Sequence, residues 1–392
     1  MQKIKRYPLL ILFTLFLFVT TVADMCANNR VFSEMENKYL TQKPAFSWSQ
    51  LFKNQYTPKY ETYINDQFVG RDWWITVKSV SESAFGKIKN NGIVYGSDHY
   101  LFEEYLTTDE DRIERNIGFL NEFVQTYGNQ VPVTVSVIPS SYAILGDYLP
   151  TGLHNVDQRA YCEQIRSQIE AEWLDLFPVM TQTAADAAAF NASREPNEEE
   201  LLAYYRTDHH WTSYGAYRAY QAFAASRGKT PVELETLKPY LYYLPDFYGS
   251  YFSKCKLYSA LPDTIAVYDL PVDSVTVGGE QKPTLHNTAQ WGVRDKHAGL
   301  LWGNADVTVI KSRNNRTQEA GKTSRVLLFK DSFGNSFAPF LTYNYDEVYV
   351  VDLRSNLTPV SELMSQVEFD DVLILYNFLS FSSSADVARI TY

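Results

Sequence analysis

Three ionisable side chains stand together at Asp208, His209 and His210, and Trp211 follows them directly. The chain has 392 residues but only six histidines, so two adjacent ones mark this stretch. A carboxylate beside an imidazole can orient a general base, ligate a metal ion or satisfy buried polar groups. Each interpretation requires different partners elsewhere in the sequence.

Ser332 is the partner that a catalytic interpretation requires. The run VLLF before it is typical of a buried strand, and a helix is expected to begin near Phe333 and Gly334. A serine hydroxyl is a weak nucleophile that needs a base within hydrogen-bond reach and a group that orients the base. His210 and Asp208 supply that pair, and backbone N–H groups at a helix N-terminus can hold an oxyanion.

Two alternatives to catalysis stay open on the residues alone. Asp208 and His210 can instead cap the helix that follows them and satisfy buried polar groups. A zinc site needs a third and a fourth ligand at suitable spacing. We expect no metal and no cofactor, because the other four histidines are scattered without ligand spacing: His99, His154, His286 and His297.

The elements that must position these residues follow the pattern of a parallel sheet. In the C-terminal part, hydrophobic runs such as VLLF, DEVYVVDL and FDDVLILYN alternate with helical segments. This alternation indicates a parallel sheet covered by helices on both faces, with active sites at the carboxyl ends of its strands. Ser332, Arg354 and Asn377 fall at such ends, while Asp208 and His210 are expected in a loop that leads into a helix.

The N-terminal half also shows regular patterns. A helical period covers residues 59–89, and Gly70 is expected to interrupt it. A second helix is expected over residues 108–127, with Thr107 and Glu110 as its capping box. The β-branched run VPVTVSVI predicts a strand, and the acidic REPNEEEL is expected to start a surface helix.

The N-terminus indicates export. Basic residues precede an apolar run from Pro8 to Ala23, so residues 1–26 are expected to be a signal peptide or a membrane anchor. The run is short for a membrane span, which needs about 20 residues. Residues 27–392, with a β-rich insertion at about 230–320, are expected to form one domain outside the cytoplasm, either secreted or anchored to the membrane.

Composition excludes some classes of partner and leaves one covalent question open. The net charge is −11 and no basic run follows residue 6, so nucleic-acid binding is not expected. Cys162 and Cys255 are the cysteines of the exported part. A disulfide and two buried free thiols are both compatible with the sequence.

Several motifs together resemble the DHHW family of bacterial exported proteins: SEMENKYL, DQFVGRDWW, TDHHWTSYGAY, LLWGN and KDSFGNSFAPFL. That family is similar to the SGNH-hydrolase-like proteins that O-acetylate alginate and other exopolysaccharides. The resemblance covers most of residues 30–385. It implies an α/β fold, an SGNH-hydrolase-like three-layer sandwich with a mainly parallel sheet. The order of the motifs is permuted, because the Asp/His block precedes the serine block, as in the alginate acetylation group.

The resemblance also implies roles for individual residues. Ser332 would be the nucleophile, His210 the base and Asp208 the group that orients it. The alginate proteins carry Asp-x-His-Trp, which favours His210 over His209. Lys330 departs from the family pattern, since a glycine usually precedes the Asp-Ser pair.

The block that completes the oxyanion hole is not intact. Asn377, at a strand end, and Asn304, in LLWGN, are the two candidates for its donor. Four residues are candidates for substrate binding: Arg71, Arg354, His209 and Trp211.

Three of those four have structural alternatives. Trp211 is expected to pack behind the histidine rather than form a substrate platform. Arg354 can bind a carboxylate or pair with Asp352. Arg71 can be a surface or salt-bridged arginine, although an arginine of this kind lies near the cleft in the resembling families.

These expectations lead to two functions from different classes. The first is an exported serine O-acetyltransferase or carbohydrate esterase that acts on a cell-surface or extracellular polysaccharide. A transferase would require a membrane-bound acyl donor protein as partner. The alternative is a non-catalytic carbohydrate-binding or scaffold subunit of a polysaccharide modification or secretion complex. For the enzyme, a neutral His210 beside Asp208 predicts that turnover rises with pH through an apparent pKa at or above about 6.5.

Overall fold

The computed structural model describes residues 7–313 and 322–392, and the chain divides into two compact units. The smaller unit comprises the described residues up to Ile88 together with Lys256–Ser259. The larger unit comprises Lys89–Cys255 and the described part of Ala260–Tyr392. This partition places residues 27–88 with the N-terminal helix, whereas the sequence predicted one domain over 27–392.

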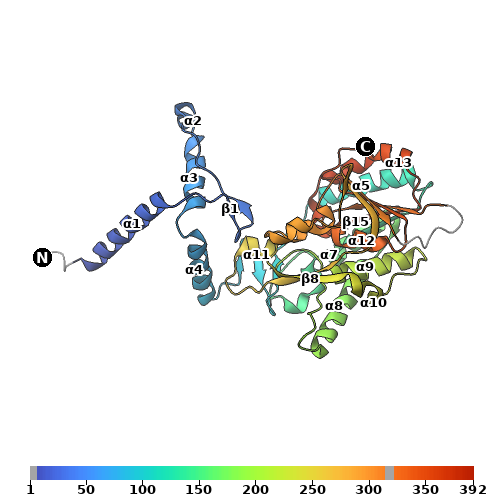
Figure 1. Ribbon diagram of the computed structural model, residues 1–392, viewed down its shortest axis with the longest axis horizontal. Coiled ribbons are helices and arrows are strands. Elements are labelled where there is room, and N and C mark those ends of the chain that lie inside the picture. The colour runs from blue at the N-terminus through green and yellow to red at the C-terminus, as the bar shows by residue number, and fades with distance from the viewer. Residues whose placement is uncertain (1–6, 314–321) are drawn as a thin grey trace. The chain divides into compact units, whose positions relative to one another are not determined.

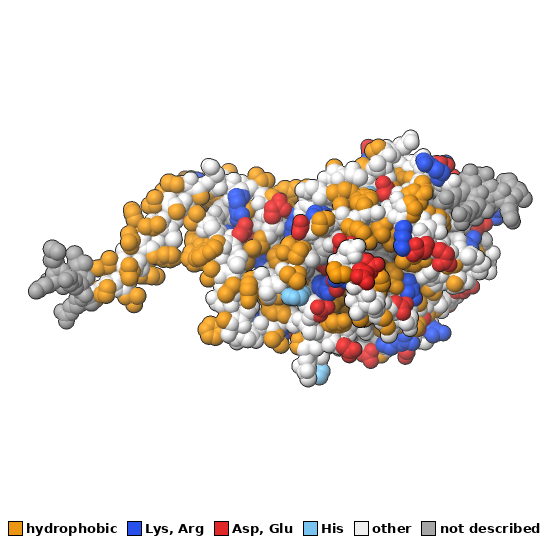
Figure 2. Space-filling view, turned by 60° about the horizontal axis from the view of Figure 1, so that its bottom comes forward, with side chains coloured by type: hydrophobic (Ala, Val, Ile, Leu, Met, Phe, Trp, Pro, Cys, Tyr) orange, Lys and Arg blue, Asp and Glu red, His pale blue; other side chains and the backbone are white. Residues whose placement is uncertain are grey.

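The smaller unit begins with helix α1, Pro8–Cys26, which has 19 residues and no buried side chain. Among the described residues it is the one helix long and apolar enough to cross a membrane. Hydrophobic side chains cover most of its surface (Figure 2). The helix continues past the apolar run and ends at Cys26, the last residue of the segment that is expected to be a signal peptide or a membrane anchor.

Gly70 separates the next two long helices, as expected. It has a φ of +67°, a conformation that glycine adopts without steric cost, and it forms the N-cap of the second helix. The remaining elements of this unit are short: β1 (Phe32–Ser33), β2 (Lys38–Tyr39), α2 (Trp48–Phe52), α3 (Tyr56–Gln67) and α4 (Arg71–Ala84).

The larger unit is built on an eight-stranded sheet with the order β11-β10-β12-β14-β13-β15-β6-β7. The pairs from β14 to β7 are parallel, and the pairs from β11 to β14 are antiparallel. The strands are β6 (Val133–Ile138), β7 (Glu172–Trp173), β10 (Val272–Val277), β11 (Glu280–Lys282), β12 (Val307–Ser312), β13 (Arg325–Lys330), β14 (Glu347–Val351) and β15 (Asp371–Asn377).

Side chains of the central strands alternate between two hydrophobic cores, one on each face of the sheet. On β13, Val326 and Leu328 belong to one core, and Leu327 and Phe329 belong to the other. Figure 1 shows the helices that surround the sheet. The first core is covered by α8 (Leu176–Ser193), α9 (Ser213–Ser226) and α12 (Gly334–Leu341), and the second by α5 (Glu110–Tyr127), α7 (Gln158–Gln168) and α13 (Val360–Gln366).

This arrangement confirms the predicted α/β three-layer fold with a mainly parallel sheet. Between 230 and 320, β10, β11 and β12 extend the central sheet, while β8 (Leu241–Phe247) and β9 (Asp263–Tyr268) form a separate two-stranded sheet. Asn91 and Gly92 form the turn of a small three-stranded antiparallel sheet. The strands of this small sheet are β3 (Lys89–Asn90), β4 (Ile93–Tyr95) and β5 (Leu101–Glu103). The short helices of the larger unit are α6 (Ser141–Ile144), α10 (Leu234–Leu237), α11 (Ser250–Cys255) and α14 (Phe378–Ser383).

Two local predictions are wrong. The cap of α5 is Asp109 rather than the Thr107 box, because the Asp109 carboxylate accepts a 2.9 Å hydrogen bond from the backbone N–H of Arg112. The acidic REPNEEEL does not start a helix. The Glu198 carboxylate instead accepts a hydrogen bond from the backbone N–H of Glu195 and closes a turn after α8.

The cysteine question has a structural answer. Cys162, on α7, and Cys255, at the end of α11, are both buried, and neither forms a disulfide. Burial raises the pKa of the Cys162 thiol to about 12, so this thiol is unreactive near neutral pH. The structure therefore holds two buried thiols.

Candidate active site

Ser332 lies in the turn between β13 and α12 and is partly exposed, although the residues on both sides of it are buried. Asp331 holds this turn in place. One of its carboxylate oxygens accepts from the backbone N–H of Phe333 at 3.0 Å, and the other accepts from the N–H of Asn377 on the neighbouring strand at 2.7 Å. At Gly334, a Cβ atom would lie 2.5 Å from the Cβ of Lys330, so the tight exit from β13 requires glycine.

His210 connects Ser332 to Asp208. The Nε2 atom of His210 lies 2.7 Å from the Ser332 Oγ, and its Nδ1 atom lies 2.5 Å from Oδ1 of Asp208. The other Asp208 oxygen accepts from the backbone N–H of Ser250 at 2.7 Å. Gly249 makes this approach possible, because a Cβ atom there would overlap Asp208. The three side chains form one hydrogen-bonded chain that runs from a buried carboxylate to an accessible hydroxyl.

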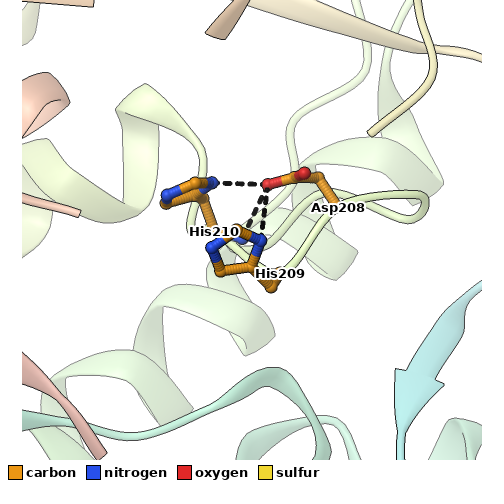
Figure 3. Close-up of side chains that lie close together, drawn as sticks. All are labelled: Asp208, His209 and His210. Carbon is orange, nitrogen blue, oxygen red and sulfur yellow. Dashed lines mark hydrogen bonds and ion pairs between the residues drawn. The ribbon is translucent and has the colours of Figure 1, made fainter. Parts of the chain in front are cut away.

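His209 lies beside the same carboxylate but faces away from Ser332. Its Nδ1 atom is 2.7 Å from the Ser250 Oγ and 3.5 Å from Asp208 Oδ1, and about a third of its side chain is exposed. Figure 3 shows both histidines directed at the single Asp208 oxygen. His210 is thus the histidine that reaches the serine, while His209 contacts the carboxylate from the side.

Burial and neighbouring charges shift the pKa values of all three groups. Burial raises the pKa of Asp208, but the two histidines outweigh it and hold that pKa well below its usual range. Burial lowers the pKa of His209, but the charge of Asp208 outweighs this effect and raises it. The pKa of His210 lies well below its ordinary value because of burial, His209 and His297, against the opposing pull of Asp208.

This result corrects the expectation that Asp208 raises the pKa of His210. The Asp208 charge acts in that direction, but burial and two neighbouring imidazoles are stronger. An imidazole with a depressed pKa is neutral at pH 7 and is ready to accept a proton. The imidazole next to Ser332 is therefore already in its basic form at neutral pH.

His297 was missed as a member of the site. It begins the 3₁₀ helix η5 (His297–Trp302), and its ring stacks on the ring of His210 with centroids 3.9 Å apart and an interplanar angle of 14°. Its Nε2 atom is buried without a hydrogen-bond partner among the described residues. No pattern in the sequence around His297 indicated this contact, because η5 and the DHHW motif are far apart along the chain and meet only in the folded unit.

Trp211 has a structural position. Its ring is fully buried, and its Nε1 donates to the backbone oxygen of Phe333 and to the Ser336 Oγ, both at 3.0 Å. Trp211 therefore fastens the DHHW loop to the turn that carries Ser332. Of the two roles considered for Trp211, the structure supports packing and not substrate binding, because the buried indole has no surface to offer a substrate.

A buried ion-pair network lies under the same turn. The Lys330 Nζ atom is 3.0 Å from Oδ2 of Asp352 and donates to Oδ1 of Asn304 at 3.0 Å. Arg354 also binds Asp352, at 2.6 and 2.8 Å, which is the pairing that the sequence offered as its alternative role. Burial lowers the pKa of Lys330. Burial acts to raise the pKa of Asp352, but Arg354 and Lys330 outweigh it, so the pKa of Asp352 lies below its ordinary value. The lysine in place of the usual glycine is thus a buried, paired cation.

Neither predicted oxyanion donor bonds to Ser332. The Asn377 carboxamide oxygen caps α14 by accepting from the N–H of Leu379 at 3.0 Å, and its nitrogen faces Ile138. Asn304 accepts from Lys330 and from Asn335. The backbone N–H of Ser332 and the carboxamide nitrogen of Asn304 make no hydrogen bond to any described residue, so both are donors that the geometry leaves available.

Arg71 belongs to the smaller unit, at the start of α4. Its guanidinium binds the Glu36 carboxylate at 2.9 and 3.1 Å and donates to the backbone oxygen of Asn65 at 2.8 Å. This is the salt-bridged arginine that the sequence offered as one alternative. The contact stabilises the unit in which both residues lie.

The Asp208, His209 and His210 cluster has the kinds of side chain that ligate metal ions. Asp208, His209 and His210 each offer one ligand atom, and these atoms lie within 4.8 Å of one another. Both ring nitrogens of His210 are already hydrogen-bonded, to Asp208 and to Ser332, and Nδ1 of His209 is hydrogen-bonded to the Ser250 Oγ. The sequence-based expectation of no metal stays a prediction, which chelation tests below.

Comparisons with known proteins agree with this architecture. A DHHW family protein from Eubacterium siraeum DSM 15702 superposes with a TM-score of 0.61 at 22% identity, covering 77% of this chain and 96% of that chain. PatB1 of Bacillus cereus superposes with a TM-score of 0.58 at 21% identity, covering 75% and 98%. PatB1 with a sulfonyl adduct gives 0.56 at 19% identity, covering 76% and 100%. These likenesses concern the fold.

The sequence itself matches the model of one family. No curated protein shows significant similarity to the chain. The model described as "DHHW protein" matches residues 118–351, a stretch that includes the motif at Asp208–Trp211 and the Ser332 turn. The resemblance predicted from the motifs is confirmed, and because the match spans more than half of the sequence, the chain belongs to the DHHW protein family.

Proposed function

We propose that this protein is an exported serine acyltransferase or esterase that adds acetyl groups to a polysaccharide or removes them from it. The observation that carries this proposal is the hydrogen-bonded chain from Asp208 through His210 to Ser332, with distances of 2.5 and 2.7 Å. A nucleophile, a base and an orienting carboxylate in this order form a constellation that performs acyl transfer on several unrelated folds.

In this mechanism Ser332 attacks the carbonyl carbon of an acyl donor. His210 Nε2 takes the hydroxyl proton as the Oγ–carbon bond forms, and Asp208 stabilises the resulting imidazolium through Nδ1. The free N–H of Ser332 donates to the developing oxyanion. His210 then returns the proton to the leaving group, and an acyl-serine remains.

The second half of the reaction decides between the two activities. A sugar hydroxyl that attacks the acyl-serine gives an O-acylated glycan, and a water molecule gives hydrolysis. In both cases His210 removes the proton from the attacking oxygen and passes that proton to the Ser332 Oγ when the bond between Oγ and the acyl carbon breaks. The resemblance to exopolysaccharide O-acetylation proteins favours a glycan as one of the two substrates.

The sulfonyl adduct of PatB1 supports a chemical test. Sulfonyl groups attach to nucleophilic side chains, and PatB1 shares this fold. We expect a sulfonyl fluoride or fluorophosphonate to label Ser332, and p-nitrophenyl acetate to be hydrolysed. Ser332→Ala should lose both, whereas Ser383→Ala, an exposed serine of the same unit, should retain both. Equal labelling and equal hydrolysis in Ser332→Ala would refute the proposal.

A second candidate function rests on the oxyanion site. The Asn377 carboxamide caps α14 and faces Ile138, so it does not supply the oxyanion donor that the resemblance implied for this strand end. A non-catalytic carbohydrate-binding or scaffold subunit would tolerate this shortage. Glycan binding in wild type and in Ser332→Ala, without ester turnover or labelling, would favour this alternative.

Localisation and partners follow from the same proposal. Helix α1 is long and apolar enough to cross a membrane, so it can act as a signal or as an anchor. We propose that the larger unit functions outside the cytoplasm. A transferase there depends on a membrane-bound protein that supplies activated acyl groups, because no described helix beyond α1 could form a membrane path in this chain.

A further inference from the structure

A cavity of about 670 Å³ lies in the larger unit, and neither Ser332 nor His210 lines it. Its wall is formed by the loop after α8, by strands β8 and β9, and by residues on both sides of the DHHW motif. This volume is within the range of roughly 300–1,000 Å³ that is usual for small-molecule sites. The proposed acyl transfer does not account for it.

Three tyrosines line the cavity: Tyr214, Tyr243 and Tyr268. Tyr268 is only 8% exposed, and its hydroxyl has no hydrogen-bond partner among the described residues. Burial raises the pKa of Tyr268, and the phenols of Tyr243 and Tyr214 contribute in the same direction, so the three groups are neighbours. A tyrosine hydroxyl at the cavity wall that is not engaged by the protein can donate a hydrogen bond to a ligand or accept one from it.

The charge on the wall restricts what can bind. Five carboxylates and two cations line the cavity, which leaves a formal charge of −3. Both cations are already paired, Arg206 with Glu200 and Asp98, and Lys238 with Glu235. Glu199 has no hydrogen bond or ion pair within the described part of the chain, so its carboxylate is available.

We propose that this cavity is a second carbohydrate subsite that takes a sugar without an acidic group, an inference that rests on the function proposed above. The tyrosine rings match the apolar face of a sugar ring, since aromatic side chains supply apolar area with a polar tip. Tyr268 and Glu199 match its hydroxyl groups. The negative wall disfavours uronic acids, because like charges in a partly enclosed site repel.

The cavity also has a structural connection to the candidate active site. Arg206 and Thr212 line the cavity and flank the DHHW motif in sequence. Asp263 lines it as well, and it accepts hydrogen bonds from the backbone N–H groups of Arg206 at 2.9 Å and Thr207 at 2.8 Å. A glycan held in the cavity is therefore anchored to the segment that carries Asp208 and His210.

Calorimetric titration of the full chain tests the subsite directly. We expect the trisaccharides of N-acetylglucosamine and of glucosamine to bind, with the trisaccharide of galacturonic acid at least about tenfold weaker. Tyr243→Ala should weaken binding by about tenfold. Tyr240→Ala is the matched control, because Tyr240 is a similarly exposed tyrosine three residues away that does not line the cavity.

Three results would overturn the subsite: no binding of either uncharged or amine-bearing trisaccharide, equal binding of the galacturonate, or unchanged binding in Tyr243→Ala. Hydrolysis of p-nitrophenyl acetate and labelling of Ser332 report on the proposed function separately. Turnover without trisaccharide binding would reject the subsite alone. Binding that persists in Ser332→Ala supports the subsite, even if the wild type shows no turnover and the acyl-transfer proposal fails.

Discussion

Asp208→Asn is the substitution whose effect the geometry defines most fully. The carboxylate uses one oxygen to accept from His210 Nδ1 at 2.5 Å and the other to accept from the N–H of Ser250 at 2.7 Å. An asparagine has one oxygen and one NH₂ group, so it cannot accept at both positions. Either orientation of the amide leaves one of these contacts with two opposed donors.

The two orientations have different costs, and both reduce activity. If the amide NH₂ faces His210, Nδ1 must act as acceptor, so the proton moves to Nε2 and the ring can no longer take the Ser332 proton. If the NH₂ faces Ser250, the loop that holds the motif is forced apart. The same change in a serine hydrolase of this chemistry lowers kcat by about 10⁴, which corresponds to about 5 kcal/mol.

The assay is kcat/KM for p-nitrophenyl acetate between pH 4 and pH 9, with thermal unfolding measured on the same samples. Asp147→Asn serves as the control, because this aspartate lies in a 3₁₀ turn outside the motif and its carboxylate makes no hydrogen bond or ion pair with a described residue.

Loss of the Asp208 charge also removes the attraction that raises the pKa of His210, so any residual inflection of the pH profile should move to lower pH. Activity within tenfold of wild type in Asp208→Asn would refute the assignment of Asp208 and His210.

Three further outcomes are expected. Because the pKa of His210 lies below its ordinary value, wild-type turnover should be level from about pH 6.5 upward and should fall only in more acidic solution, as His210 gains a proton; an inflection above pH 7 would contradict this. Lys330→Met should lower the free energy of unfolding, measured in urea, by roughly 3 kcal/mol, because it removes one partner of the buried Asp352 charge. Lys311→Met, which breaks a half-exposed pair with Glu347, should lower it by under about 1 kcal/mol. Equal effects of the two substitutions would contradict the argument from burial. Dialysis against a chelator should leave ester hydrolysis unchanged, and a loss that zinc restores would assign the Asp208 cluster to a metal instead.

The sequence predicted those features that depend on local pattern. The strand before Ser332 and the helix after it follow from hydrophobic periodicity and from the small residues of the turn, and both are present as β13 and α12. The loop that carries Asp208 and His210 leads into α9, as expected. Because strand ends of a parallel sheet meet at one edge, placing Ser332 there was enough to predict that distant residues would gather around it.

Features that depend on side-chain direction were not predictable in this way. Asn377 lies at the expected strand end, but its carboxamide caps α14 rather than facing Ser332. Trp211 turns inward to bond to Phe333 and Ser336. His297 stacks on His210 from a separate segment, and the depressed pKa of His210 arises partly from that contact. Asp208 and His209 are both near His210 in the sequence and act on its pKa in opposite directions, whereas its burial and the contact with His297, which decide the outcome, depend on the fold.

The distance along the chain between the two halves of the site has a consequence for how activity arises during biosynthesis. His210 and Ser332 are 122 residues apart, and β13 lies between β14 and β15, which both follow it in the sequence. A growing chain that already contains Asp208, His210 and Ser332 still lacks both strands that flank the nucleophile. The candidate active site therefore cannot assemble before β15 has been synthesised and inserted, because β13 pairs with both β14 and β15. If Ser332 is the nucleophile proposed above, incomplete chains would be inactive, and completion of the sheet would itself switch the serine on.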